Sequence, residues 1–330
     1  MSENILEVKN LRAYYNILKG QVKAVDDITF NLKKGEILGL AGESGCGKST
    51  LASSFISRKK PLEYVSGEVD LVGHEIMKMD EAEFKKLRLK TISIIPQYAL
   101  DAFSPTKKIR TFIKDLAHQH GIKTDRAFME KVEERLDLVN LDKSVLNRYS
   151  IELSGGMKQR VVMVISTILD PDFIIADEIT SALDVSSQRF VATMLANLRD
   201  LEIIKSAIFI THDLSILYQI ADRIMIMYAG NFAEIAPTDE IVARPRHPYT
   251  RALINSLPKV GIQYHDKRLS GIEGTPPHLL NIGDGCRFRD RCPYAIEKCE
   301  ETPIREKVAD NHYVSCWRWQ ELGSDLNVEE

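Results

Sequence analysis

A glycine-rich segment near the start of the chain constrains the fold more than any other feature. It reads Gly-Glu-Ser-Gly-Cys-Gly-Lys-Ser-Thr and fits the pattern G-x-x-x-x-G-K-S/T. The apolar residues 36–41 before it predict a buried strand, and residues 49–57 after it predict a helix. In that context the loop wraps backbone N–H groups around phosphates. We predict that it binds a nucleotide and Mg²⁺ through Gly42, Glu43, Ser44, Gly45, Cys46, Gly47, Lys48, Ser49 and Thr50.

Three residues of this loop have distinct expected roles. Lys48 reaches the β- and γ-phosphates, and the Ser49 hydroxyl binds Mg²⁺. Cys46 is expected to be a small space-filling residue without a catalytic role. Because a helix N-terminus lowers the pKa of a thiol, we predict that alkylation of Cys46 blocks nucleotide hydrolysis and that bound nucleotide protects it.

A second buried-strand pattern, residues 173–176, ends in two carboxylates. Asp177, directly after the strand, is expected to reach the Mg²⁺ through water. Glu178 is placed to polarise the attacking water as a general base. The pair therefore supplies the acidic half of a nucleotide-hydrolysing site.

The segment that begins Leu153-Ser154-Gly155-Gly156 predicts a second phosphate-binding surface. Ser154 can cap a helix, and the two glycines leave backbone N–H groups open. One chain has no need of two such surfaces for one nucleotide. We therefore expect two chains to pack head to tail, each closing the site of the other.

Composition and patterning place these motifs in a globular α/β chain of 330 residues with a net charge of -3. That balance argues against a nucleic-acid binder. Strand patterns at residues 207–211 and 223–227 alternate with helical ones, such as 127–139, and predict a parallel sheet. No apolar run is long enough to span a bilayer, and the start lacks a secretory signal pattern, so we expect a cytosolic protein. Prolines gather after residue 236, and we predict a domain boundary near 235.

Taken in order, these motifs resemble those of the ATP-binding subunits of ABC transporters. The resemblance implies an α/β ABC-type P-loop ATPase core, residues 1–235, with an antiparallel β subdomain and a helical subdomain at about 98–168. It implies that ATP is the nucleotide. By the same resemblance, Gln97 contacts Mg²⁺ and water, Asp184 crosses the dimer interface, His212 contacts the γ-phosphate, and Tyr15 rather than Tyr14 stacks on adenine. Ile179 stands where the family usually has proline, and we expect no loss of activity from it.

The last part of the chain contains four cysteines spaced C-x₅-C-x₆-C-x₁₆-C. By spacing alone they can hold an iron–sulfur cluster or zinc, or remain unliganded or disulfide-bonded. Residues 244–253, 274–277 and 285–295 resemble the C-terminal extension of dipeptide/oligopeptide permease ATPases. The resemblance implies a 4Fe–4S cluster, with zinc as the alternative, that staples the extension (residues 236–330); its ligands would be Cys286, Cys292, Cys299 and Cys316.

Three arginines, Arg287, Arg289 and Arg291, lie between the first two of these cysteines. They either balance the charge of an anionic cluster locally or contact anionic lipid or a neighbouring subunit.

The expected function is that of an ATP-hydrolysing subunit of a membrane importer. The resemblance implies di- or oligopeptide cargo, with oligosaccharides or nickel complexes as alternatives. It implies a heterodimer with a second related ATPase, two transmembrane permease subunits and an extracytoplasmic solute-binding protein, with this chain on the cytoplasmic face of the membrane. Two further alternatives are a soluble ABC ATPase acting on nucleic acid or ribosomes and a non-catalytic iron–sulfur protein that uses ATP as a switch. Glu178 and His212 argue against the last.

Overall fold

The computed structural model describes residues 4–57, 60–97, 103–181, 183–257 and 271–322, and the chain divides into two compact units. The first unit is built mainly from Lys78–Thr211. The second comprises Leu6–Leu32, Glu36–Met77 and His212–Glu330. Residues 98–102 of the predicted helical subdomain, and Ala182, lie outside the described residues.

The first unit contains three parallel strands in the order β8-β7-β6. Their bounds are β6 Ile92–Ile95, β7 Phe173–Asp177 and β8 Ser206–Ile210. All residues of β7 and β8 are buried, as expected for parallel strands covered on both faces. The strands predicted at residues 173–176 and 207–211 are therefore confirmed, with small differences at their ends.

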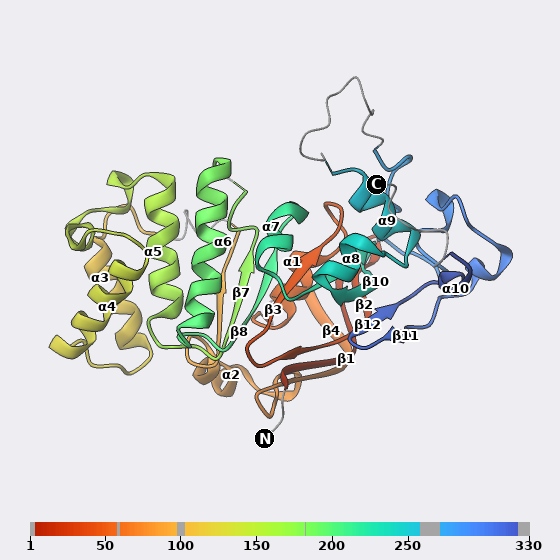
Figure 1. The fold of residues 1–330 in the computed structure, drawn as a ribbon. Coiled ribbons are helices and arrows are strands. Elements are labelled where there is room, and N and C mark those ends of the chain that lie inside the picture. Colours follow the sequence, from red (N-terminus) through yellow and green to blue (C-terminus); the bar gives the residue numbers. More distant parts are fainter. Residues whose placement is uncertain (1–3, 58–59, 98–102, 182, 258–270, 323–330) are drawn as a thin grey trace. The chain divides into compact units, whose positions relative to one another are not determined.

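Helices make up the rest of this unit, and α3, α4 and α5 lie beside one another (Figure 1). In α4 the buried residues are Phe128, Val132 and Leu136, a four-residue spacing that places them on one face. Asp125 begins α4 by accepting a hydrogen bond from the Phe128 N–H at 3.0 Å. The helices are α2 Glu81–Leu87, α3 Ile109–Gln119, α4 Arg126–Leu138, α5 Gly155–Thr167 and α6 Val185–Asp200.

The second unit contains a sheet with the strand order β2-β1-β4-β5. The pairs β1–β4 and β4–β5 are antiparallel, which agrees with the predicted antiparallel β subdomain. In β1 and β4, Leu6 lies opposite Leu71 and Val8 opposite Val69, all of them buried. The strands are β1 Asn4–Ile17, β2 Gly20–Lys33, β4 Leu62–Leu71 and β5 His74–Glu75.

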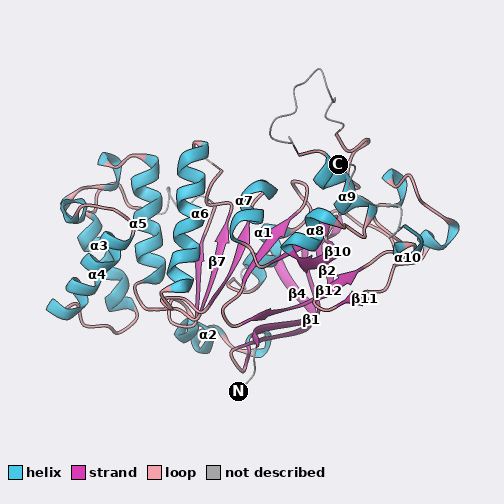
Figure 2. Ribbon diagram, viewed as in Figure 1, coloured by secondary structure: helices cyan, strands magenta, loops and turns pink. Residues whose placement is uncertain are grey.

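A further run of strands in this unit has the order β11-β12-β10-β9-β3. Three of these strands, β10, β11 and β12, are labelled in Figure 2. Only β3 and β9 pair in parallel, and the remaining pairs are antiparallel. The C-terminal hairpin β11–β12 thus adds to the edge of β10, and the boundary predicted between residues 235 and 236 falls inside β10. The strands are β3 Ile37–Ala41, β9 Arg223–Tyr228, β10 Asn231–Pro237, β11 Glu306–Ala309 and β12 His312–Val314.

Short helices complete the second unit. The phosphate-loop helix α1 begins at Lys48, one residue before the predicted start. The helix α9 has proline at its first position, and His247 caps it through a bond from the Tyr249 N–H to Nδ1 at 3.0 Å. The helices are α1 Lys48–Ser54, α7 Leu214–Ile220, α8 Thr238–Ala243, α9 Pro248–Asn255 and α10 Trp319–Leu322.

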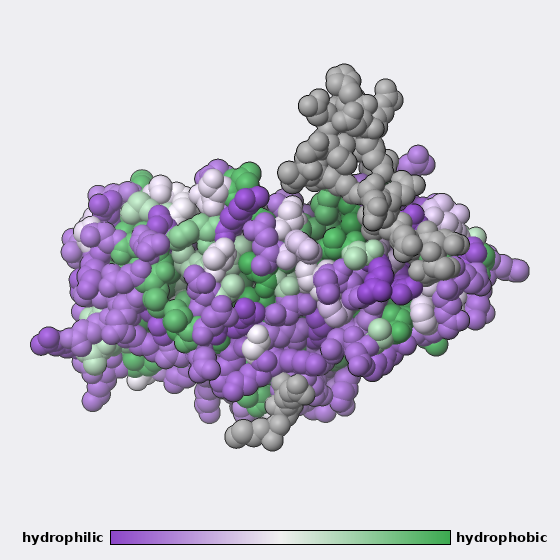
Figure 3. Space-filling view, viewed as in Figure 1, coloured by the Kyte–Doolittle hydropathy of each residue, from purple (hydrophilic) through white to green (hydrophobic). Residues whose placement is uncertain are grey.

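The surface is mostly hydrophilic on the face drawn in Figure 3. The apolar side chains of the central strands are buried instead. Among the described residues, no helix combines the length and hydrophobicity that crossing a membrane requires.

Candidate nucleotide site and the C-terminal extension

The phosphate loop connects β3 to α1, as its sequence predicts. Two of its glycines are required by close backbone contacts. At Gly42 (φ 147°) a Cβ would lie 2.2 Å from the Met227 carbonyl oxygen, and at Gly47 (φ 107°) 2.0 Å from that of Ala24. Any side chain at either position would displace the backbone, so only glycine permits this loop to pack against the unit.

Lys48 is buried, and its ammonium group faces the inside of this loop. It donates hydrogen bonds to the carbonyl oxygens of Gly42, at 2.8 Å, and Glu43, at 3.2 Å. A cation held by main-chain carbonyls inside a phosphate loop is available to an incoming polyphosphate. The arrangement fits the role predicted for Lys48.

Cys46 is buried in the same loop with a raised thiol pKa. Burial is the main cause, and it outweighs the nearby Lys48 ammonium, which acts in the opposite direction. The expectation of a lowered pKa at a helix N-terminus is therefore wrong, because desolvation disfavours the thiolate more than the cation stabilises it. The structure agrees with the space-filling role.

Two adjacent tyrosines in β1 have different surroundings. The Tyr15 side chain is partly exposed, and its hydroxyl lies 3.3 Å from the Thr50 hydroxyl of the phosphate loop. The Tyr14 side chain is buried, and its hydroxyl donates to the Asp26 carboxylate at 2.5 Å. Tyr15 therefore has a partly exposed side chain next to the loop, and Tyr14 is held in a buried polar cluster.

The acidic residues predicted for catalysis lie at the end of β7 in the first unit. Asp177 is buried, and Glu178 follows it with a left-handed backbone (φ 48°) fixed by a bond from its N–H to the Ile210 carbonyl oxygen at 2.9 Å. The Gln97 side-chain amide donates to the Glu178 carboxylate at 2.7 Å. The structure thus brings Gln97 and Glu178 together. Ile179, the residue after Glu178, is buried.

The residues predicted to contact a partner's nucleotide lie at helix starts in the same unit. Ser154 caps α5 through its hydroxyl, which accepts from the Met157 N–H at 3.3 Å. In the described part of the chain, no atom outside the adjoining helix backbone lies within 4 Å of the position of a Cβ on Gly155 or Gly156, so this segment is open to a partner molecule. Leu153 before it is buried.

Asp184 caps α6, and its carboxylate accepts from the N–H and the hydroxyl of Ser187 at 3.0 and 2.7 Å. These two bonds lower the pKa of Asp184. His212 belongs to the second unit, where its side chain is exposed directly before α7. The residues predicted for ATP binding and hydrolysis are thus divided: the phosphate loop, Tyr15 and His212 lie in the second unit, and the others lie in the first unit.

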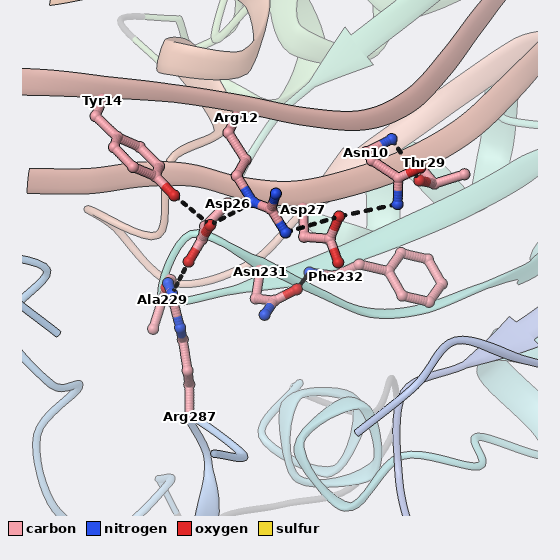
Figure 4. Close-up of polar contacts among 10 residues, drawn as sticks. All are labelled: Asn10, Arg12, Tyr14, Asp26, Asp27, Thr29, Ala229, Asn231, Phe232 and Arg287. Carbon is pink, nitrogen blue, oxygen red and sulfur yellow. Dashed lines mark hydrogen bonds and ion pairs between the residues drawn. The ribbon is translucent and has the colours of Figure 1, made fainter. Parts of the chain in front are cut away.

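Two arginines of the extension, Arg287 and Arg291, form ion pairs with carboxylates earlier in the second unit. Arg287 forms a buried ion pair with Asp26 of β2, and its other terminal nitrogen donates to the Ala229 carbonyl oxygen. Figure 4 shows Tyr14, Arg12 and Arg287 converging on Asp26. Burial lowers the pKa of the Arg287 guanidinium, and the Asp26 carboxylate opposes that shift.

Arg291 pairs with Glu43 of the phosphate loop, at 2.7 Å between Nη1 and Oε2. Arg289, by contrast, is exposed and contacts the neighbouring Asp290. The alternative that the three arginines contact lipid or a subunit is therefore not supported for Arg287 and Arg291. Both arginines pair with carboxylates of the same chain, Arg287 with Asp26 and Arg291 with Glu43. Their charges are therefore balanced within the chain, but by carboxylates and not by an anionic cluster.

A fully buried carboxylate, Glu234 of β10, joins its own strand to two separate parts of the extension. It accepts hydrogen bonds from the Arg246 N–H at 2.8 Å, the His247 N–H at 2.9 Å and the His312 Nε2 at 2.7 Å. Burial of His247 lowers the pKa of its imidazole to about 4. Glu234 therefore ties β10, the start of α9 and the hairpin strand β12 together.

Known protein families match both the N-terminal and the C-terminal part of the chain. Residues 25–181 match the family model of the ABC transporter, and residues 233–299 match that of the oligopeptide/dipeptide transporter C-terminal region. The chain is 38% identical over 321 residues to the dipeptide transport ATP-binding protein DppD of Caldanaerobacter subterraneus, across 96% of this chain and 98% of the relative. It belongs to the dipeptide/oligopeptide ABC transporter ATP-binding family. The ATPase predicted from the motifs is therefore confirmed as an ABC-type ATPase.

Other members and solved structures extend this likeness. The oligopeptide transport ATP-binding protein AppF of Bacillus subtilis is 39% identical over 323 residues, across 95% of this chain and 97% of AppF. An ATP-binding cassette solved as a dimer in a post-hydrolysis state with ADP and Pi has a TM-score of 0.63, covering 71% of this chain and 98% of that one. Its sequence is 23% identical, so it shows the ABC ATPase fold alone.

The iron–sulfur cluster expected in this family member is not supported by the structure, and neither is zinc. Among the described residues, no group of three or more His, Cys, Asp or Glu side chains is arranged to hold a metal ion. Burial raises the pKa of the Cys286 thiol to about 11 and that of Cys316 to about 12, and neighbouring cysteines add to both shifts. The four cysteines of the extension therefore lie in one neighbourhood. The spacing of four cysteines in the sequence does not decide whether their side chains turn toward a common centre.

Proposed function

We propose that this ABC ATPase powers the import of dipeptides or oligopeptides. The observation that carries the proposal is that the likeness to peptide-transport ATP-binding proteins extends over 96% of the chain, including the C-terminal region. An ATPase core alone would support the ABC family but no class of cargo.

In the proposed cycle, the phosphate loop and Ser49 hold ATP and Mg²⁺, with Tyr15 stacking on adenine. Glu178 polarises the attacking water, and the Gln97 amide, 2.7 Å from the Glu178 carboxylate, keeps that group oriented. His212 contacts the γ-phosphate. The open segment at Ser154–Gly156, together with Asp184, closes the nucleotide site of a second, related ATPase, so that ATP binding joins the two chains.

We further propose that this dimer acts on two permease subunits that receive peptides from a solute-binding protein outside the membrane. The chain would then lie at the cytoplasmic face, held there by the permease subunits. The proposed domain boundary near residue 235 separates the ATPase core from the extension. No step of this cycle depends on an iron–sulfur cluster. Whether the chain binds such a cluster is a separate prediction, which iron and sulfide analysis of the chain purified without oxygen tests.

The catalytic part is tested with Glu178→Gln in the assembled transporter. The carboxamide cannot accept the proton, so ATP turnover should fall by about 100-fold or more, while ATP binding persists. Glu134→Gln, an exposed glutamate of α4, is the matched control and should retain turnover. Normal turnover in the Glu178→Gln protein would exclude Glu178 as the base.

The cargo is tested by purifying the chain from native membranes in mild detergent and identifying what accompanies it. Permeases and a peptide-loaded binding protein would support the proposal. If the binding protein carried an oligosaccharide or nickel, the proposed mechanism would stand and the proposed peptide cargo would be wrong. Recovery with ribosomes or nucleic acid, without membrane subunits, would contradict the transporter function.

A further inference from the structure

The phosphate loop contains a carboxylate next to the place where an anionic ligand binds. Glu43 follows Gly42, the first residue of the loop, and 25% of its side chain is exposed. An unpaired carboxylate there would repel the phosphates of ATP, since like charges at short range disfavour binding. The structure must therefore neutralise Glu43 or accept weaker nucleotide binding.

Arg291 of the extension neutralises it with a two-point ion pair. Its Nη1 lies 2.7 Å from Glu43 Oε2, and its Nη2 lies 3.1 Å from Oε1. The Arg291 side chain is 5% exposed, so solvent screens this pair little. The bond to Glu43 raises the pKa of Arg291, which remains charged.

All five N–H donors of the Arg291 guanidinium have an acceptor. Besides the two carboxylate oxygens, these are the carbonyl oxygens of Glu273 and Ile272, at 2.8 and 3.1 Å, and the Tyr228 hydroxyl at 3.0 Å. Gly274 lies against the stem of the arginine. A fully satisfied fork of this kind is fixed in position, and no other cationic side chain reproduces it.

A second residue of the extension holds the main chain at the same point. The Glu43 N–H donates to the Tyr249 hydroxyl at 2.8 Å, and the Tyr249 ring packs against Phe288 and Tyr228. The Glu43 carbonyl oxygen in turn accepts from the Lys48 ammonium. Contacts therefore run without interruption from the extension through Glu43 to the lysine expected to bind phosphate.

We propose that Arg291 is a positioning residue for ATP: it cancels the charge of Glu43 and fixes the phosphate loop from the C-terminal extension. This inference rests on the proposed use of the loop for ATP. It assigns the extension a direct part in nucleotide binding, through a pair of residues separated by 248 positions in the chain.

The test measures the Kd of the purified full chain for Mg·ATP by equilibrium titration. Arg291→Gln should weaken binding about tenfold, because it leaves a carboxylate charge uncompensated beside the phosphates. Adding Glu43→Gln to that variant should restore binding to the wild-type level or better, since the repelling charge is then gone. The loss in the single variant should also shrink as NaCl rises from about 50 mM to about 500 mM.

Arg289→Gln is the matched control, because it makes the same charge change two residues away without touching the loop, and it should bind ATP as the wild type does. Glu43→Gln alone is the second variant in case Arg291→Gln does not fold, and it should bind ATP about threefold more tightly. Unchanged binding by Arg291→Gln, failure of Glu43→Gln to rescue it, or weaker binding by Glu43→Gln alone would each overturn the proposal. Failure of the wild-type chain to bind ATP would instead refute the proposed function.

Discussion

Removing the buried carboxylate of Glu234 should detach the C-terminal extension before the rest of the chain unfolds. Glu234→Ala leaves the Arg246 N–H, the His247 N–H and the His312 ring nitrogen without their acceptor. A buried donor that loses its partner costs about 1–3 kcal/mol. Relaxation and the saved desolvation of the carboxylate offset part of the sum, so we expect a loss of about 3–5 kcal/mol. That is a large fraction of the stability of a typical domain.

The chain offers a local probe for this measurement. Its two tryptophans, Trp317 and Trp319, both lie in the extension. Tryptophan fluorescence during urea unfolding therefore reports on the extension, and far-ultraviolet circular dichroism reports on the whole chain. With a slope of about 1–3 kcal/mol per M, the fluorescence midpoint should fall by about 1–5 M urea.

Two variants calibrate the result. Glu234→Gln keeps one acceptor oxygen and should lose about half as much stability as Glu234→Ala. Glu297→Ala removes an exposed glutamate of the same extension and should leave the midpoint unchanged. If Glu234→Ala shifted the fluorescence midpoint no more than Glu297→Ala does, the carboxylate would not join the three segments energetically, and the reasoning would fail.

Two further predictions follow from pKa shifts of buried groups. The folded-state pKa of His247 is about 4, below its ordinary 6.5, so the folded chain binds fewer protons than the unfolded chain between these values, and stability falls as the pH drops from about 6.5 towards 4. At pH 5 the loss should be about 2 kcal/mol by the fluorescence assay, and a His247→Asn variant that kept the full pH dependence would contradict the assignment. The raised pKa of Cys46 predicts slow alkylation at neutral pH, slower than that of free cysteine under the same conditions. Rapid modification of Cys46, measured by mass spectrometry of its peptide, would show that the thiol is not buried in solution.

The motifs of the nucleotide site could be predicted from the sequence because their signals are local. The phosphate loop, the strand that ends at Asp177 and the glycine pair at Gly155 each combine residue type with adjacent strand or helix patterns. Backbone preferences and apolar periodicity act over a few residues, so these elements could be placed nearly residue by residue. The choice of Tyr15 over Tyr14 also agrees with their exposure.

The four cysteines of the extension could not be assigned in the same way. Four cysteines within a short segment predicted a metal staple, but their side chains are not arranged around a metal ion among the described residues. The predicted direction of the Cys46 pKa shift was wrong for a related reason. Sequence showed the helix start and the lysine, but burial, which dominates the shift, is a property of the packed loop.

By itself, then, the sequence determined the ATPase motifs, the alternating strands and helices, and the family resemblance that led to an ABC-type ATPase. Only the tertiary structure decided which charges meet. Arg291 could have paired with any of 47 acidic residues, and no local pattern connects it to Glu43. Long-range ion pairs depend on where folding brings two side chains and on how little water remains between them, and neither quantity is written in the spacing of residues along the chain.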